Sequence, residues 1–172
     1  MSFLGQLLLV AGQQQLTNQK GDRTVREITR VIVPVDFLKN ADKLVDYSTS
    51  MAEKLSAVIH FIHVVTFPTG DAMIGAPFVA EYEGKLLADA QARMSNLLED
   101  NSERCPGCSG EVVIGDPVDK IVEIAEAKDS DLVIISTHGA RGLEKILLGS
   151  VAERVLKRAH CPVLTMNPFK KK

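Results

Sequence analysis

The sequence lacks a charge excess and both common glycine-rich phosphate signatures. Its 20 basic and 22 acidic residues give a formal net charge of −2, so no basic face for nucleic acid is expected. Neither G-x-x-x-x-G-K-S/T nor G-x-G-x-x-G occurs, which argues against a P-loop or a Rossmann dinucleotide site. H-E-x-x-H and S-x-x-K are also missing, so the sequence shows no recognisable strong catalytic device.

The chain also has no hydrophobic run long enough to span a bilayer. The apolar stretch at residues 3–11 is too short, and no basic residue precedes it, so neither a membrane partner nor a cleaved signal peptide is expected. We therefore expect a cytoplasmic protein. Residues 1–26 form an N-terminal extension, either a mobile arm or a segment that packs on a partner subunit. Residues 169–172 form a solvated basic tail.

The three cysteines are too few for a structural zinc site, which takes four ligands. Cys105 and Cys108 form a C-x-x-C pair, and Cys161 stands apart. A thioredoxin-like pair would follow a strand and open a helix, whereas this pair follows an expected helix and precedes an expected strand. An incidental turn is favoured, and a disulfide, a metal site or catalytic redox chemistry are the alternatives. His60 and His63 are three apart in an expected strand, so they face opposite sides and make a poor metal pair.

Apolar runs alternate with segments of helical periodicity and predict an α/β fold. The length of 172 residues suits one main domain, without an internal repeat. The pattern predicts a three-layer α/β/α sandwich with a doubly wound, five-stranded parallel sheet. Strands are expected at 28–35, 57–66, 110–114, 131–136 and 162–166, helices at 41–55, 81–100 and 117–128, a fourth helix after Gly149, and a loop at 67–80. Ser56 should end the first helix, Asp116 should cap the third, and Tyr82, Leu86, Ala90, Met94 and Leu97 should face inward from the second.

The most informative segment joins the fourth expected strand to the last helix. It reads Ser136-Thr137-His138-Gly139, nine residues, then Gly149-Ser150-Val151. Glycine lets a backbone approach a ligand closely, and the first turn of a helix carries unpaired N–H groups that suit a phosphate. This order of strand, glycine-bearing loop and helix predicts a phosphate site.

Together with the downstream residues 160–164, this segment resembles the C-terminal signature of the universal stress protein family, in its ATP-binding branch. The family pattern is Gly-x-x-Gly, nine residues, Gly-Ser/Thr, and Ser136 stands where its first glycine is expected. The resemblance covers residues 27–168, because 33–36 and 63–65 resemble the ends of the family's first two strands. It implies the fold of the adenine nucleotide alpha hydrolases.

The resemblance implies ATP or AMP as ligand, with Mg²⁺ carried in by ATP and no dedicated metal cage. Asp36 and Val64 would contact adenine, His138 and Gly139 would line the ribose and phosphates, and Gly149, Ser150 and Val151 would hold the phosphate chain. The full set of implied binding residues is Pro34, Val35, Asp36, Val64, Ile135, Ser136, His138, Gly139, Gly149, Ser150 and Val151. Two alternatives stay open: Asp36 acts only as a cap or turn residue, or the Cβ of Ser136 crowds a ribose.

The expected function is that of an ATP or AMP sensor in a stress response, with at most slow ATP hydrolysis. The alternative is a dimeric stress or scaffold protein that binds no nucleotide. An adenylyl-transferring or ATP-pyrophosphatase enzyme would need a Ser-Gly-Gly-x-Asp-Ser-type loop where this chain has residues 36–39 as Asp-Phe-Leu-Lys. The last strand, Pro162 to Met166, is apolar and lacks guarding charges, so we expect a homodimer through this edge.

Overall fold

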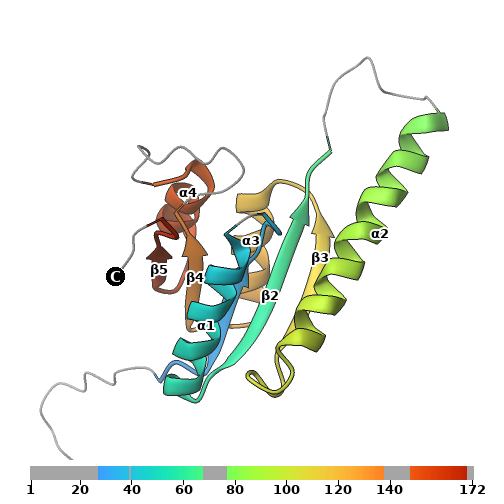
Figure 1. Ribbon diagram of the computed structural model, residues 1–172. Helices are drawn as coiled ribbons and strands as arrows, with labels where there is room; N and C mark the ends of the chain where they lie inside the picture. Colours follow the sequence, from blue (N-terminus) through green and yellow to red (C-terminus); the bar gives the residue numbers. More distant parts are fainter. Residues whose placement is uncertain (1–26, 39, 68–76, 138–147, 170–172) are drawn as a thin grey trace, which may run out of the picture.

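The computed structural model describes residues 27–38, 40–67, 77–137 and 148–169. In these ranges, strands and helices alternate, and five strands form one sheet in the order β3-β2-β1-β4-β5 (Figure 1). Every neighbouring pair of strands is parallel. The elements are β1 (Arg30–Pro34), α1 (Ala41–Leu55), β2 (Val58–Val65), α2 (Pro77–Asp100), β3 (Ser109–Ile114), α3 (Pro117–Ala127), β4 (Leu132–Ser136), α4 (Ser150–Arg158) and β5 (Val163–Met166).

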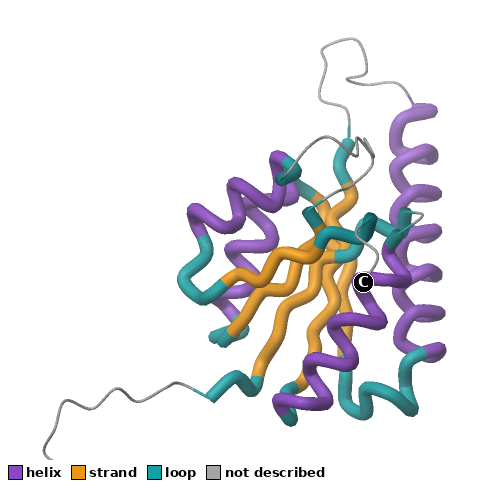
Figure 2. Tube along the Cα trace, turned by 60° about the vertical axis from the view of Figure 1, so that its left-hand side comes forward, coloured by secondary structure: helices purple, strands orange, loops and turns teal. Residues whose placement is uncertain are grey.

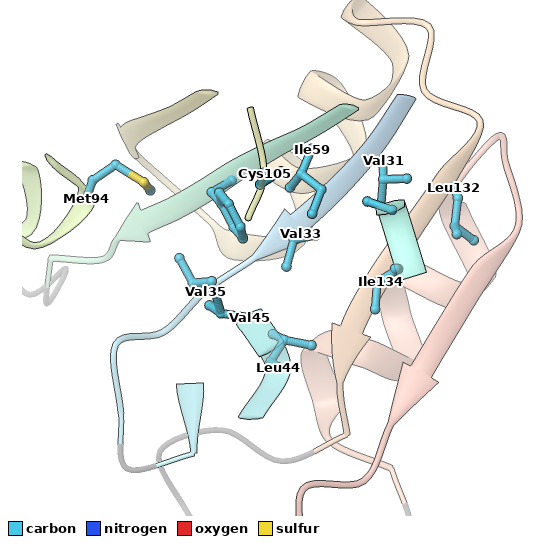
Figure 3. Packing of buried hydrophobic residues seen from close by; sticks show 12 residues of the cluster. Val31, Val33, Val35, Leu44, Val45, Ile59, Met94, Cys105, Leu132 and Ile134 are labelled. Carbon is cyan, nitrogen blue, oxygen red and sulfur yellow. The ribbon is translucent and has the colours of Figure 1, made fainter. Parts of the chain in front are cut away.

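Helices cover both faces of the sheet, which confirms the three-layer sandwich (Figure 2). On one face, Val33 and Ile59 pack with Leu44 of α1 and Met94 of α2 (Figure 3). The other face has its own cluster, in which strand residues pack with α3 and α4; its members include Ile32, Ile62, Val118, Ala152 and Val155. Because successive strand residues point to opposite faces, a strand covered by helices on both faces is apolar at consecutive positions where it is buried. This explains the continuous apolar runs of β1 and β4.

Two signals read from the sequence set helix ends as predicted. Ser56 ends α1 in the left-handed conformation, with φ of 55°. Asp116 precedes α3, and its carboxylate accepts hydrogen bonds from the N–H groups of Val118 and Asp119 at 2.9 and 3.1 Å. Pro117 occupies the first helical position, where a missing N–H costs nothing.

The second helix begins earlier than the sequence predicted. α2 starts at Pro77, so the loop expected over 67–80 is wrong at its carboxyl end. The first turns of α2 extend past the ends of the strands (Figure 1), and Tyr82, expected to face inward, is 47% exposed there. Ala90 and Met94, further along, are buried as expected. No helix of the described ranges, α2 included, combines the length and the apolar character needed to cross a membrane.

The sheet is joined unevenly at its middle, between β1 and β4. β1 pairs with β2 over five residues, but with β4 over two, Val31 with Leu132 and Ile32 with Val133. At the amino ends, the carboxylate of Asp131 accepts hydrogen bonds from the Thr29 N–H, the Thr29 hydroxyl and the Arg30 N–H, all within 3.0 Å. The strands are therefore tied at their amino ends and unpaired at their carboxyl ends. Here the strand order reverses, which is where ligands bind in doubly wound sheets.

Candidate functional site at the carboxyl ends of β1 and β4

The end of β1 is built so that the two strands can separate without leaving a donor unsatisfied. The N–H of Val35 donates to the Ile62 carbonyl of β2 at 2.8 Å. Because backbone groups alternate in direction along a parallel strand, Pro34 faces β4, where the ladder has already stopped. Proline has no N–H and needs no partner there. Its place at the last position of β1 therefore leaves no unsatisfied N–H donor where the ladder between β1 and β4 ends.

Asp36 follows this strand end and is exposed. Its Oδ1 accepts a hydrogen bond from the Leu38 N–H at 3.0 Å, which is the pattern of an Asx-turn. The interpretation of Asp36 as a turn residue is thus correct. It does not exclude ligand binding, because one carboxylate offers two oxygens and about four acceptor positions.

Phe37 adds a feature that the sequence analysis missed. Its φ is +54°, a conformation that a bulky side chain rarely adopts and that collects at functional sites. The Phe37 ring lies 4.6 Å from the ring of His63, centroid to centroid. The Nδ1 atom of His63 is 2.7 Å from the Val35 carbonyl oxygen; since a carbonyl only accepts, Nδ1 carries the proton and donates. No sequence pattern marks a left-handed phenylalanine, and the one available signal was its position after Asp36.

The end of β4 holds the start of the last helix by direct backbone contact. The N–H of the buried residue Thr137 donates to the Met166 carbonyl at 2.8 Å, and the Thr137 carbonyl accepts from the Gly149 N–H at 2.7 Å. A Cβ on Gly149 would lie only 2.8 Å from this carbonyl oxygen. Glycine is therefore required at 149 by close approach. Thr137 also escaped the sequence analysis, because its contribution is a backbone carbonyl.

Helix α4 begins at this contact, so its amino end lies at the carboxyl edge of β4. Gly149 occupies the cap position and supplies no side-chain acceptor. Ser150 is exposed as the first helical residue, and Val151 packs partly against the cluster under α3 and α4. The N–H groups of a helix's first turn and its partial positive charge favour an anion at this point.

The structure brings the described part of the predicted site to one edge of the sheet. Three of its members have side chains turned into the core: Val35 and Ile135 are buried in opposite clusters, and Val64 packs partly against one of them. These three can offer a ligand their backbone rather than their side chains. The described members at this edge are Pro34, Val35, Asp36, Val64, Ile135, Ser136, Gly149, Ser150 and Val151, whereas His138 and Gly139 lie outside the described residues.

The cysteine pair forms the turn between α2 and β3. The Cys108 N–H donates to the Cys105 carbonyl at 3.0 Å, and Gly107 has φ of +84°, as the third residue of a type II turn requires. Both thiols are free. Burial, followed by the adjacent Cys105 thiol, raises the pKa of Cys108 to about 11, the opposite of an activated thiol. Within the described part of the chain, no group of three or more His, Cys, Asp or Glu residues could hold a metal ion.

These features define a doubly wound α/β protein with the amino end of a helix at the point where the strand order reverses. The sequence model of the universal stress protein family matches residues 27–166, and the chain belongs to this family. It is 34% identical over 145 residues to Universal stress protein MJ0531 of Methanocaldococcus jannaschii, covering 83% of this chain and 84% of that protein.

Solved structures share the fold. The structure of hypothetical protein MJ0577 has 26% identity and a TM-score of 0.73, covering 86% of this chain and 99% of that one. A universal stress protein in complex with cAMP has 20% identity and a TM-score of 0.62, covering 83% and 99%. The Archaeoglobus fulgidus universal stress protein in complex with dAMP has 19% identity and a TM-score of 0.51, covering 81% and 98%.

Proposed function

We propose that this protein binds ATP or AMP at the carboxyl ends of β1 and β4 and acts as a nucleotide-dependent sensor in a cytoplasmic stress response. The observation that carries the proposal is the pairing of β1 with β4 over only two residues. Beyond this short ladder, Asp36 after β1 lies at the same edge of the sheet as the amino end of α4, which has no side-chain cap. Adenine nucleotides in structures of other family members support the ligand class.

On the β1 side, Asp36 is the adenine-recognising residue. One carboxylate oxygen is used by the Leu38 N–H, and the second accepts from the adenine 6-amino group. The backbones of Pro34, Val35 and Val64 border the base. A guanine has a carbonyl oxygen at the same ring position, which a carboxylate would repel, so this contact favours adenine over guanine.

On the β4 side, the first turn of α4 holds the phosphates. The N–H groups of Ser150 and Val151 are the donors, and Ile135 and Ser136 line the sugar. Gly149, whose own N–H is bonded to the Thr137 carbonyl, allows the backbone to approach the phosphates closely. His138 and Gly139 complete this side by family resemblance. Mg²⁺ enters with ATP, bound mainly by its phosphates. Hydrolysis, if it occurs, is slow, because the sequence contains no recognised catalytic motif.

Asp36→Asn tests the base contact without removing the turn. The amide oxygen still accepts from Leu38, while its NH₂ group meets the adenine amino group donor to donor. Titration calorimetry should show ATP affinity reduced by roughly 5- to 150-fold and the preference for ATP over GTP reduced or reversed. Asp42→Asn removes the same charge from an exposed position in α1 and should leave ATP affinity unchanged. Absence of ATP binding by the parent protein would refute the proposal and favour the nucleotide-free scaffold.

The phosphate contact is tested by Gly149→Val and Ser150→Ala. Gly149→Val should abolish ATP binding, because its side chain would occupy the space beside the Thr137 carbonyl. Ser150→Ala should weaken binding less, since the backbone donor remains. Unchanged affinity for Gly149→Val, in a protein folded by circular dichroism, would place the phosphates elsewhere.

We further propose a homodimer through β5, residues Pro162 to Met166, which is an edge strand of the described sheet. The carbonyls of Pro162 and Met166 accept from Val133 of β4 and from Thr137, which follows β4. Thr165, at an alternate position, therefore directs its N–H outward. Thr165→Pro removes this donor and should give monomers by light scattering, whereas Thr165→Ala should stay dimeric. A monomeric parent protein, or a dimeric Thr165→Pro variant, would exclude this interface.

A further inference from the structure

A second polar cluster lies on β2 and β3, in the half of the sheet away from β4 and β5. The register pairs His60 with Ser109 and Ile62 with Glu111. The Nδ1 atom of His60 is 2.8 Å from the Ser109 hydroxyl oxygen, and its Nε2 atom is 2.7 Å from Oε1 of Glu111. The three side chains form a hydrogen-bonded row of hydroxyl, imidazole and carboxylate.

The charges fix the direction of both hydrogen bonds. Burial lowers the pKa of His60 against the opposing hydrogen bond to Glu111, and the ammonium of Lys128 adds to the lowering. Burial would raise the pKa of Glu111, but the hydrogen bond and charge of His60 and the charge of Lys128, whose Nζ is 3.5 Å away, outweigh it and lower that pKa. At neutral pH the imidazole is therefore neutral and the carboxylate ionised. An ionised carboxylate only accepts, so Nε2 carries the proton and Nδ1 accepts the Ser109 O–H.

Exposure and backbone direction complete the arrangement. Ser109 is exposed as the first residue of β3, while the side chain of His60 is only 13% exposed. The Gly115 N–H donates to Val65 of β2, and alternation along a parallel strand therefore turns the Gly110 N–H away from β2. β3 ends the described sheet on this side. A backbone donor directly after the nucleophile is a common oxyanion-stabilising group in serine acyl transfer.

We propose that Ser109 is an activated nucleophile that accepts acyl groups from activated esters and thioesters, with His60 as general base and Glu111 as the residue that positions the imidazole. The Ser109 oxygen attacks the carbonyl carbon, and its proton passes to Nδ1 of His60. The bond to the leaving group breaks, and the leaving phenolate or thiolate takes this proton. The product is an acyl ester of Ser109, and no oxidation or reduction occurs. The proposal does not rest on nucleotide binding.

The probe is p-nitrophenyl acetate, and the readouts are the burst of p-nitrophenolate and the acetylated peptide in digests of the full-length protein. Acetylation is expected at Ser109 and absent in Ser109→Ala. Ser102→Ala is the matched control, because Ser102 is also exposed but donates to the Glu99 carbonyl at 2.8 Å; it should behave as the parent. His60→Gln should slow acetylation of Ser109 about 100-fold or more.

The pH dependence of the Ser109 acetylation rate distinguishes a general base at position 60 from a residue with only a structural role. The rate should follow deprotonation of His60, with a midpoint below the ordinary value of 6.5. Lys128→Gln removes a charge that lowers the pKa of His60 and should move the midpoint up. Glu111→Gln removes a group that raises this pKa and should move the midpoint down. Because Lys128→Gln and Glu111→Gln leave His60 in place, the test does not depend on whether His60→Gln folds.

Acetylation confined to lysines, an equal Ser109 rate in His60→Gln, or a midpoint that neither variant moves would overturn the proposal. ATP affinity should be the same in Ser109→Ala and the parent. If the parent protein binds ATP but does not acetylate Ser109, only the nucleophile proposal has failed, and the reverse result refutes only nucleotide binding.

Discussion

Alanine at position 149 is a sharp test of the contact between the end of β4 and α4. Gly149 has φ of −69° and ψ of 151°, a backbone conformation open to any residue, so the substitution causes no torsional strain. By restricting the unfolded chain it would even favour folding by about 0.4–1 kcal/mol. The opposing effect is steric, because the new Cβ would lie 2.8 Å from the backbone oxygen of Thr137.

The steric effect should win. Relief requires a shift of α4 or of the β4 end, and overpacking of this kind costs about 1–3 kcal/mol. The shift also lengthens the 2.7 Å hydrogen bond from Gly149 to Thr137, which is worth about 0.5–1.5 kcal/mol. We expect Gly149→Ala to lower the free energy of unfolding by about 2 kcal/mol. In a chain of this size that corresponds to a Tm lower by about 4–8 °C.

Calorimetric or circular-dichroism melting checks the expectation, with Gly84→Ala as the matched control. Gly84 lies inside α2, and no heavy atom lies within 4 Å of the position its Cβ would take. Alanine is the better helix former there by about 1 kcal/mol, so the control should raise Tm. If Gly149→Ala raised Tm as well, the close approach inferred at the start of α4 would be wrong.

Three further outcomes follow from local geometry. Ser56→Gly should raise the free energy of unfolding by about 1 kcal/mol in chemical denaturation, because Ser56 ends α1 at φ of 55°, where a side chain is strained and glycine is not. A lower free energy of unfolding in the variant would contradict this strain. Hydrogen bonds, first from the Asp119 N–H and then from that of Val118, lower the pKa of Asp116, so its stabilisation is complete above the ordinary value of 3.8 and lost as pH falls through the lower native value. Acid unfolding of Asp116→Asn should lack this component, and identical parent and variant curves would exclude it. Alkylation of Cys108, with its pKa raised to about 11, should be slow at neutral pH and accelerate towards that pH, and fast labelling at neutral pH would contradict the shielding.

The fold could be predicted because its determinants are local in sequence. Continuous apolar runs marked β1 and β4, and single residues such as Ser56 and Asp116 marked helix ends through their own backbone preferences. The start of α2 could not be placed, because its first turns extend past the ends of the strands and Tyr82 is 47% exposed there, so the inward periodicity does not mark this end of the helix.

The site was predictable only in part for a related reason. Glycine and serine at the start of α4 are visible in the sequence, but the Thr137 carbonyl that positions them is backbone and leaves no residue signal. Phe37 and His63 meet across two strands. The contact of His60 with Ser109 joins residues 49 apart and depends on the register of β2 against β3, which neither strand's own sequence specifies.

The uneven joint in the middle of the sheet lies between two groups of strands, β3-β2-β1 and β4-β5, which Asp131 ties together at their amino ends. That carboxylate binds Thr29 and Arg30 at one end of the joint, and no ladder holds the other end. A nucleotide bound to Asp36 in one group and Ser150 in the other would tie the carboxyl ends together and stabilise the folded protein by mass action. A partner protein could then detect bound nucleotide through the increased stability of the contact between β1 and β4, on surfaces that do not touch the nucleotide.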